Sequence, residues 1–150
     1  MPQSLFKMLA HIVFSTKNRA DLIAPEIENG LFGYMHGIVE NNAAKLIIAN
    51  GTANHVHLLV SLPKKIDIPV LIGDIKRDSS SWIKKQNDSY SNFYWQKGYG
   101  AFLIGQSQVE IVVNYIKRQK EHHKQQDFKD EFRALLKKYA IDYDEQYVWD

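Results

Sequence analysis

The sequence has 150 residues, a length typical of one domain large enough to bury a core, so we expect a single domain over 1–150. Hydrophobic residues make up 45% and charged residues 24%, as in ordinary globular proteins. The absence of cysteine excludes disulfides and thiolate metal sites and fits a cytoplasmic protein. No apolar run approaches transmembrane length, so we expect no membrane partner. The net charge of +2 says little about nucleic acid, but Lys and Arg cluster at 76–85 and 117–138.

The first predicted element is an apolar strand over Leu9–Phe14, followed by a polar, basic loop over 15–19. Pro25 suits the start of a helix. Apolar residues recurring three and four positions apart continue that helix to about Asn41.

A second strand is predicted over Lys45–Ala49, and Asn50-Gly51 is a strong turn signal. The apolar run His55–Leu62 follows at once and is typical of a buried strand. We therefore expect these two strands to form a hairpin.

The second half of the chain begins with the clearest amphipathic helix, which Asp67 is expected to cap and which runs from 68 to about 85. A polar, aromatic loop over 86–100 leads into a short strand at Ala101–Ile104. One long helix is predicted over about 106–126, and a short helical tail starts at Phe128.

The first six elements follow the ferredoxin-like βαββαβ order. This order predicts an α+β fold with a four-stranded antiparallel sheet, helices on one face, and the first and third strands at its centre. A further helix and the helical tail complete the chain. The open face of the sheet must then be covered by these later helices, by a partner subunit or by a nucleic acid.

His55 and His57 lie two residues apart on the third strand. Side chains alternate faces along a strand, so both imidazoles point the same way, and Val56 points the other way. Two imidazoles side by side on a rigid strand form half of a metal site. A His-x-His pair also arises by chance, so these two residues alone do not establish one.

Three polar side chains share one edge of the helix predicted over about 106–126. At about 100° per residue, Tyr115 and Gln119 lie about 40° apart, and His122 lies within about 20° of Tyr115. A half-buried tyrosine with its hydroxyl in water is the commoner explanation. The chemical interpretation is a nucleophile, for which a phenol near pKa 10 needs help from a divalent cation that polarises the target phosphate. Gln119 then offers a carbonyl oxygen as a third ligand beside the two imidazoles.

The chain resembles the HUH-type single-tyrosine transposases of small insertion sequences, including domesticated relatives that act on repeated palindromes. An HUH pair followed about sixty residues later by Tyr-x-x-x-Gln, in this order of elements, is specific. The similar segments are His11–Lys17, His55–Leu62, Lys76–Ser80, Trp95–Phe102 and Tyr115–His123. Asn54 stands where many relatives carry an acidic residue, and it is expected, like His122, to support the site from behind its ligands.

The resemblance implies that His55, His57 and Gln119 hold a divalent metal and that Tyr115 attacks one strand of DNA. The product is a 5′-phosphotyrosine and a free 3′-hydroxyl, which later attacks the phosphotyrosine and rejoins DNA. Two transesterifications conserve the phosphodiester energy, so no nucleotide cofactor is needed. Hard phosphate ligands favour Mg²⁺, with Mn²⁺ as a substitute.

The implied substrate is single-stranded DNA with hairpins near the ends of the element. The candidates for phosphate contacts are basic residues of the clusters and of the first loop, whose alternative is an ordinary solvated surface. They are Lys17, Arg19, Lys76, Arg77, Lys84, Lys117, Arg118 and Lys120. Trp95 and Tyr99 are candidates for stacking on bases, although Trp95 suits the core equally well.

The resembling transposases are dimers, which implies a homodimer with composite active sites. Tyr115 of one chain is then expected to work with His55 and His57 of its mate. Other functions remain open from the residues themselves: a domesticated HUH nuclease that no longer moves an element, a plasmid replication or conjugation nuclease, and a non-catalytic module that binds single-stranded nucleic acid on its sheet.

Overall fold

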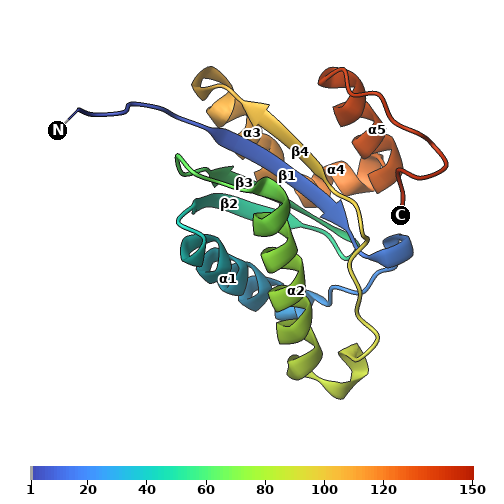
Figure 1. Ribbon diagram of the computed structural model, residues 1–150. Coiled ribbons are helices and arrows are strands. Elements are labelled where there is room, and N and C mark those ends of the chain that lie inside the picture. The colour runs from blue at the N-terminus through green and yellow to red at the C-terminus, as the bar shows by residue number, and fades with distance from the viewer. Residues whose placement is uncertain (1) are drawn as a thin grey trace.

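The protein is described by a computed structural model covering residues 2–150, the side chain of His123 excepted. Its centre is one antiparallel sheet, in which the strand order is β2-β3-β1-β4 (Figure 1). The strands are β1 (Leu9–Ser15), β2 (Lys45–Gly51), β3 (His55–Ser61) and β4 (Gly100–Ile104). This order confirms the predicted ferredoxin-like α+β fold with β1 and β3 as the central pair.

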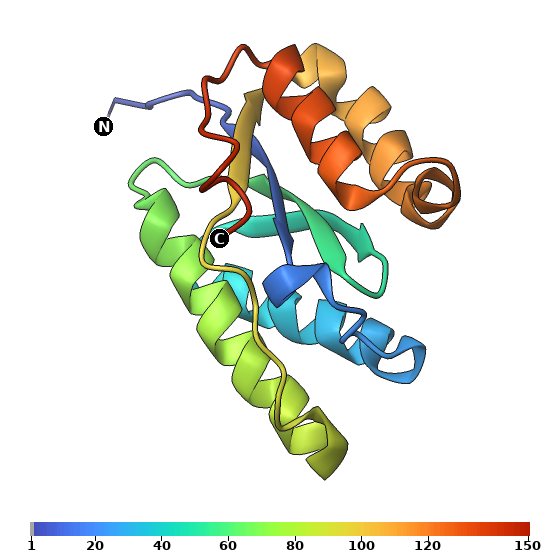
Figure 2. The ribbon, with the colours of Figure 1, turned by 90° about the vertical axis from the view of Figure 1, so that its right-hand side faces the viewer.

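Helices cover both faces of the sheet (Figure 2). On one face lie α1 (Pro25–Asn41) and α2 (Ile68–Gln86). On the other lie α3 (Val109–Lys117), α4 (Gln119–Gln125) and α5 (Phe128–Lys138). Three short 3-10 helices are η1 (Lys17–Arg19), η2 (Asp88–Tyr90) and η3 (Gln106–Gln108). The later helices therefore cover the face that the βαββαβ order leaves open.

The alternation of side chains along β1 and β3 divides the apolar residues between the two faces. The larger core joins the sheet to α1 and α2, and its strand residues include Ile12, Phe14 and Leu58. Two smaller clusters lie beneath α3 and α5. Their strand residues include Val13, on the same face as His55 and His57, as the pairing of Val13 with His57 shows.

The turn predicted at Asn50-Gly51 is wrong, because both residues belong to β2 and pair with His57 and Val56. Gly51 is needed there for close approach, since a Cβ at this position would lie 2.2 Å from the carbonyl oxygen of His55. The connection to β3 follows instead at 52–54, where the Thr52 amide donates to the His55 carbonyl at 3.0 Å.

The single helix predicted over about 106–126 is also wrong, because α3 ends before Arg118, whose φ of −96° and ψ of 17° are not helical. The side-chain amide of Asn50 explains part of this break. Its Nδ2 donates to the carbonyl oxygens of Ile116 and Lys117 at 2.9 and 3.2 Å, so it satisfies the end of α3 from a neighbouring strand.

The predicted start of α2 is confirmed, since the side chain of Asp67 accepts from the Val70 amide at 3.1 Å.

Within the residues that the structure describes, no helix is both long and apolar enough to cross a bilayer.

Trp95 belongs to the core and is only 9% exposed. Its ring meets Phe14 and Phe93 edge to face at centroid distances of 4.9 and 4.8 Å, and its Nε1 donates to Ser79 Oγ at 3.0 Å. Stacking on DNA bases would require this side chain to leave the core.

We expect Trp95→Ala to lower the free energy of unfolding by about 3–5 kcal/mol, measured by urea denaturation, because it removes a large buried ring. Trp95→Phe is the matched control. It keeps ring contacts and loses chiefly the bond to Ser79, at a cost of about 1–3 kcal/mol. Equal stability of Trp95→Ala and the unchanged protein would contradict the core assignment.

Candidate active site

The site lies on the sheet face beneath α3, α4 and α5. His55 and His57 point to this face from β3, as predicted, and both are buried, at 1% and 0% exposure. Their ring centroids lie 5.2 Å apart. Because central strands of a sheet are held on both sides, the two rings start from a rigid backbone.

Tyr115 on α3 and Gln119 on α4 stay together despite the break at Arg118. The Tyr115 ring lies 5.8 Å from the ring of His57. Gln119 is fully buried, and its Oε1 lies 3.0 Å from Nε2 of His55. The structure thus brings together the four residues predicted to act on DNA.

Glu131 of α5 stands at the centre of this group, and sequence reasoning missed it. Its Oε1 lies 3.2 Å from Nε2 of His55 and 3.1 Å from Nε2 of His57. Its Oε2 accepts hydrogen bonds from the Tyr115 hydroxyl and from Nε2 of Gln119. A pattern in the sequence does point to it, since Glu131 falls on the apolar face of α5, between Phe128 and Phe132.

A close contact between α5 and the sheet brings Glu131 to this position. A Cβ on Gly100 would lie 2.7 Å from Cε1 of Phe132, so only glycine allows the ring to approach β4 this closely. The ring of Phe128 packs 4.7 Å from that of His55. The start of α5 is fixed by Asp127, whose side chain accepts from the Asp130 amide at 2.9 Å.

The far nitrogen of His55 is held by acceptors. Its Nδ1 lies 2.7 Å from Oδ1 of Asn54 and 3.0 Å from Oγ1 of Thr52. Asn54 Nδ2 donates to the carbonyl of Arg19 at 3.4 Å, which turns Oδ1 toward His55. A neutral His55 therefore carries its hydrogen on Nδ1 and directs a lone pair from Nε2 toward Gln119 and Glu131.

Two further histidines touch the group. Nε2 of His11, on β1, lies 2.8 Å from Nδ1 of His57. The His122 ring stacks on Tyr115 with centroids 4.6 Å apart, so His122 lies beside Tyr115 as the helical spacing predicted. His11 is buried. In the sequence it is a polar residue within an apolar strand, and this pattern is the signal that could have indicated its part in the site.

Charges in the site follow from burial and from these contacts. Burial alone would raise the pKa of Glu131, but the neighbouring imidazoles of His55 and His57 outweigh it and hold that pKa well below its usual range. Burial, and then the charge of Glu131, raise the pKa of Tyr115 above its ordinary value. The site therefore pairs a carboxylate with a neutral phenol.

These residues fit a divalent cation. Oε1 of Gln119, Oε1 of Glu131 and the lone pair of a neutral His55 are all acceptors, and only a cation or a proton can satisfy them together. The ligand atoms of His55, His57 and Glu131 lie within 4.8 Å of one another. Imidazole nitrogen with carboxylate and amide oxygen is a donor set suited to Mn²⁺ and, through the oxygens, to Mg²⁺.

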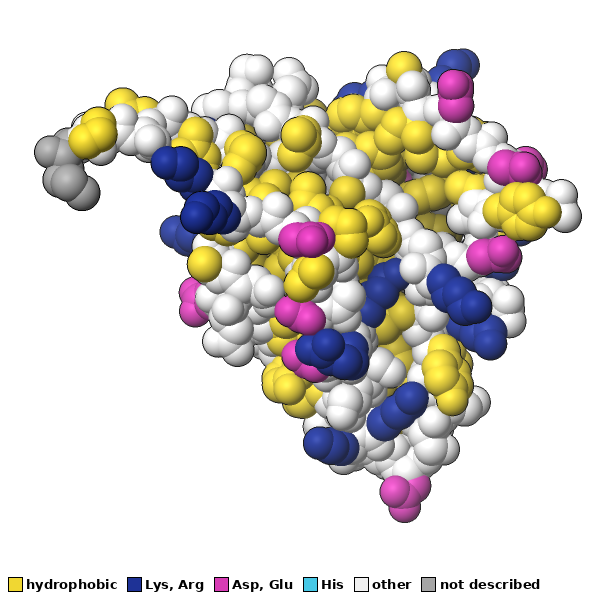
Figure 3. Space-filling model, viewed as in Figure 1, with side chains coloured by type: hydrophobic (Ala, Val, Ile, Leu, Met, Phe, Trp, Pro, Cys, Tyr) yellow, Lys and Arg dark blue, Asp and Glu magenta, His cyan; other side chains and the backbone are white. Residues whose placement is uncertain are grey.

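The predicted phosphate contacts do not form one surface. Figure 3 shows Lys and Arg side chains gathered beside α2 on the side of η1. There Lys17 and Lys84 both lie over the ring of Tyr94, at 5.7 and 4.4 Å, and Arg19 donates to the Trp149 carbonyl at 2.9 Å. A cavity of about 480 Å³ opens beside Lys17 and Arg19.

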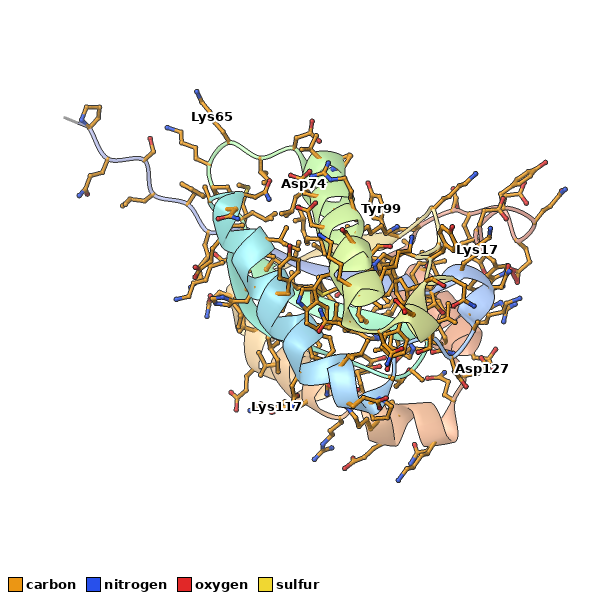
Figure 4. All side chains as sticks on the ribbon, turned by 90° about the horizontal axis from the view of Figure 1, so that it is seen from below. Lys17, Lys65, Asp74, Tyr99, Lys117 and Asp127 are labelled. Atoms are coloured by element: carbon orange, nitrogen blue, oxygen red, sulfur yellow. The ribbon has the colours of Figure 1, made fainter. Side chains whose placement is uncertain are left out.

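The other basic candidates lie elsewhere. Lys117 and Arg118 are exposed at the junction of α3 and α4, and Figure 4 shows Lys17 and Lys117 far apart. Lys120 pairs with Glu28 at 2.5 Å, and Arg77 pairs with two aspartates of α2, Asp74 and Asp78.

Lys76 is bound within the chain. Its Nζ donates to the carbonyl oxygens of Gln96, Lys97 and Gly98 at 2.9, 3.2 and 2.6 Å. Burial lowers the pKa of Lys76 to about 8. Lys76 therefore holds the loop before β4 in place. Its ammonium group is already bound by carbonyl oxygens and is not free to contact a phosphate.

The structure describes one chain, and in it Tyr115 lies on the histidines of the same chain. This differs from the expected composite arrangement, in which Tyr115 serves the partner's His55 and His57. All the groups of the site are thus present within a single chain.

Comparisons with known proteins identify the family of the chain. A family model described as "Transposase IS200 like" matches residues 4–119, well over half of the chain. The transposases for insertion sequence element IS200 of Salmonella typhimurium (strain LT2) and Salmonella typhi are each 28% identical over 119 residues, covering 76% of this chain and 78% of the relative.

Two solved structures share the fold. One is a protein of Deinococcus radiodurans R1 solved as a candidate transposase, with a TM-score of 0.62, 20% identity and coverage of 79% of this chain and 98% of that one. The other is a REP-associated tyrosine transposase bound to a REP hairpin, with a TM-score of 0.62, 15% identity and coverage of 82% and 73%. Because the family model matches well over half of the chain, over a range that includes β3 and α3, the chain belongs to the IS200-like transposases, which are single-tyrosine HUH enzymes.

Proposed function

We propose that this transposase cleaves and rejoins single-stranded DNA through a phosphotyrosine at Tyr115, beside a divalent cation held by His55, His57 and Gln119. The observation that carries this proposal is that one carboxylate, Glu131, contacts the Tyr115 hydroxyl and both imidazole Nε2 atoms. The nucleophile and the metal ligands are thus neighbours within a buried site.

The proposed reaction is a pair of exchanges at phosphorus. The Tyr115 oxygen bonds to the phosphorus while the bond from phosphorus to the 3′-oxygen breaks, and the phenolic proton is released as the 3′-oxygen gains one. The reverse exchange by a 3′-hydroxyl restores Tyr115. Because each step replaces one phosphate ester with another, no nucleotide cofactor is needed.

A bound Mg²⁺, with Mn²⁺ as a substitute, would polarise the target phosphate and stabilise its developing charge. The chain's own part is to orient the groups around it. Glu131 adds an anionic oxygen to the neutral ligands and holds the Tyr115 hydroxyl next to them. Asn54 fixes the ring of His55 through Nδ1.

For the substrate we propose single-stranded DNA that carries a hairpin, since a relative of the same fold is described as bound to a REP hairpin. The basic and aromatic side chains beside η1, with Lys17, Arg19 and Lys84, supply charge for phosphates and rings for unpaired bases. Exposed Lys117 and Arg118 add charge next to Tyr115.

A non-catalytic module that stacks bases on its sheet is the weaker alternative. Such binding needs an open sheet face, but helices cover both faces here (Figure 2). Buried histidines, a tyrosine and a carboxylate in mutual contact are more readily explained by catalysis.

We also propose a homodimer in which each chain keeps its own complete site, because Tyr115 packs on His57 of the same chain. The shared arrangement expected from the resemblance is the alternative outcome of the third test below.

Replacing the nucleophile gives the first test. Tyr115→Phe removes only the phenolic oxygen, so we expect no covalent adduct with hairpin-bearing single-stranded DNA in the presence of Mg²⁺, measured by denaturing gel electrophoresis. DNA binding should stay within about twofold, because phosphate contacts dominate affinity. Tyr34→Phe, at an exposed tyrosine on α1 outside the site, is the control. An undiminished adduct in Tyr115→Phe would remove this residue from its role.

Titration with Mn²⁺ tests the ligands. Loss of a residue that only hydrogen-bonds to a metal ligand weakens metal binding by about 10–100-fold. We expect His55→Ala and His57→Ala, which remove the ligands themselves, to weaken Mn²⁺ binding further. Gln119→Ala should lose less, because water can replace an amide oxygen. His36→Ala, an exposed histidine on α1, should bind like the unchanged protein. Unchanged affinity in the double variant of His55 and His57 would refute this site.

Complementation tests which chain supplies Tyr115. The mixed dimer contains one Tyr115→Phe chain and one His55→Ala chain. If each chain uses its own groups, one site lacks the tyrosine and the other lacks a histidine, so we expect no cleavage. If cleavage returned, the tyrosine of one chain would be serving the histidines of the other. A different affinity tag on each chain isolates the mixed dimer, and light scattering establishes that it is a dimer.

A further inference from the structure

We propose that His11 is a positioning residue of the metal centre, which sets the ring orientation and the tautomer of His57. The inference rests on the proposed cation at His55 and His57, and it concerns the chain's own hydrogen bonds behind those ligands.

The contact is direct and buried. Nε2 of His11 lies 2.8 Å from Nδ1 of His57, and the ring centroids are 5.1 Å apart at an interplanar angle of 31°. His11 is 2% exposed and His57 is not exposed. Val13 of β1 pairs with His57 of β3. His11 lies two residues before Val13 on the same face of the sheet, so it is the diagonal neighbour of His57.

The surroundings of His11 offer little else to account for an imidazole. Its ring meets the edges of Phe102 and Tyr115 at centroid distances of 6.2 Å each. A polar ring buried among aromatic side chains is costly unless it is hydrogen-bonded. Among the described residues, the hydrogen bond found for the His11 side chain is the one to His57.

The direction of this bond decides which nitrogen of His57 can face a cation. Burial among aromatic rings disfavours a charged imidazole at His11. If Nε2 of His57 presents a lone pair to a cation, its one hydrogen is on Nδ1. Nδ1 then donates to Nε2 of His11, in the way that metal-binding histidines use their second nitrogen.

His11 differs from the partner of the other ligand. Oδ1 of Asn54 can only accept from His55, whereas an imidazole nitrogen can accept or donate. Without a cation, Nε2 of His57 lies 3.1 Å from the Glu131 carboxylate, which requires a hydrogen on Nε2, and Nδ1 then accepts from His11. Each neutral ring carries one hydrogen in both forms, so His11 suits both without a change in their charge.

The test compares Mn²⁺ affinity by calorimetry in two variants of the full chain. His11→Phe keeps a ring but removes the hydrogen bond, and we expect a loss of about 10–100-fold in affinity. His11→Gln is the conservative variant, since its amide can accept from or donate to Nδ1 of His57, and we expect affinity near that of the unchanged protein. Thermal unfolding in a chelator serves as the control for folding.

The two failures are distinguishable. If the unchanged protein did not bind Mn²⁺, the proposed metal centre would be wrong. If it bound but His11→Phe bound equally well, or if His11→Gln lost as much as His11→Phe, the proposed role of His11 would be wrong and the metal centre would stand.

A second measurement needs no variant and settles the matter if His11→Phe does not fold. Nitrogen-15 NMR of the unchanged protein saturated with Mg²⁺ identifies the protonated nitrogen of each imidazole. We expect the hydrogen of His57 on Nδ1. A hydrogen on Nε2 under saturating Mg²⁺ would overturn the inference.

Discussion

The organisation of the site depends on one buried charge, the carboxylate of Glu131. This residue is only 4% exposed, and an unpaired carboxylate in such a place would be strongly destabilising. Its Oε2 accepts from Tyr115 of α3 and from Gln119 of α4, and its Oε1 lies within 3.2 Å of Nε2 of His55 and of His57 from β3. A single side chain of α5 thus connects the central sheet with both helices that carry the reacting groups.

This connection makes the last helix part of the active site, not only a cover for the sheet. Gly100 permits the approach of Phe132 to β4, and Asp127 caps the start of α5. Both features place Glu131 one turn into the helix, over the two imidazoles. The family match ends at residue 119, so this contribution comes from a part of the chain beyond the matched span.

Much of the fold and half of the site could be predicted because they follow from short-range periodicity. A period of two placed His55 and His57 on one face, and a helical period brought Tyr115 near Gln119 even though the helix breaks between them. His11 and Glu131 could not be assigned in this way. Each is one polar residue on an apolar face, and its partner lies 46 or 74 residues away in the sequence, where no local pattern reaches.

The same limit explains the errors in local structure and in the basic surface. Asn50 looked like a turn residue, but its side chain satisfies the end of α3, 66 residues later. Lys76 looked like one more exposed base on α2, but three carbonyl oxygens of another loop surround its ammonium group. Tertiary hydrogen bonds determine what both residues do, and neither could be read from its neighbours in the sequence.

The central claim is that the cluster on this sheet face is a cation centre with the nucleophile beside it. Crystals of the protein soaked in Mn²⁺ test this most directly, because anomalous diffraction locates the ion without assumptions about its ligands. We expect one strong anomalous peak, which places a Mn²⁺ ion within bonding distance of Nε2 of His55 and of His57. Oxygens of Gln119 and Glu131 should lie next to the ion. A peak elsewhere, with both nitrogens still bonded to Glu131 at saturating Mn²⁺, would contradict the account.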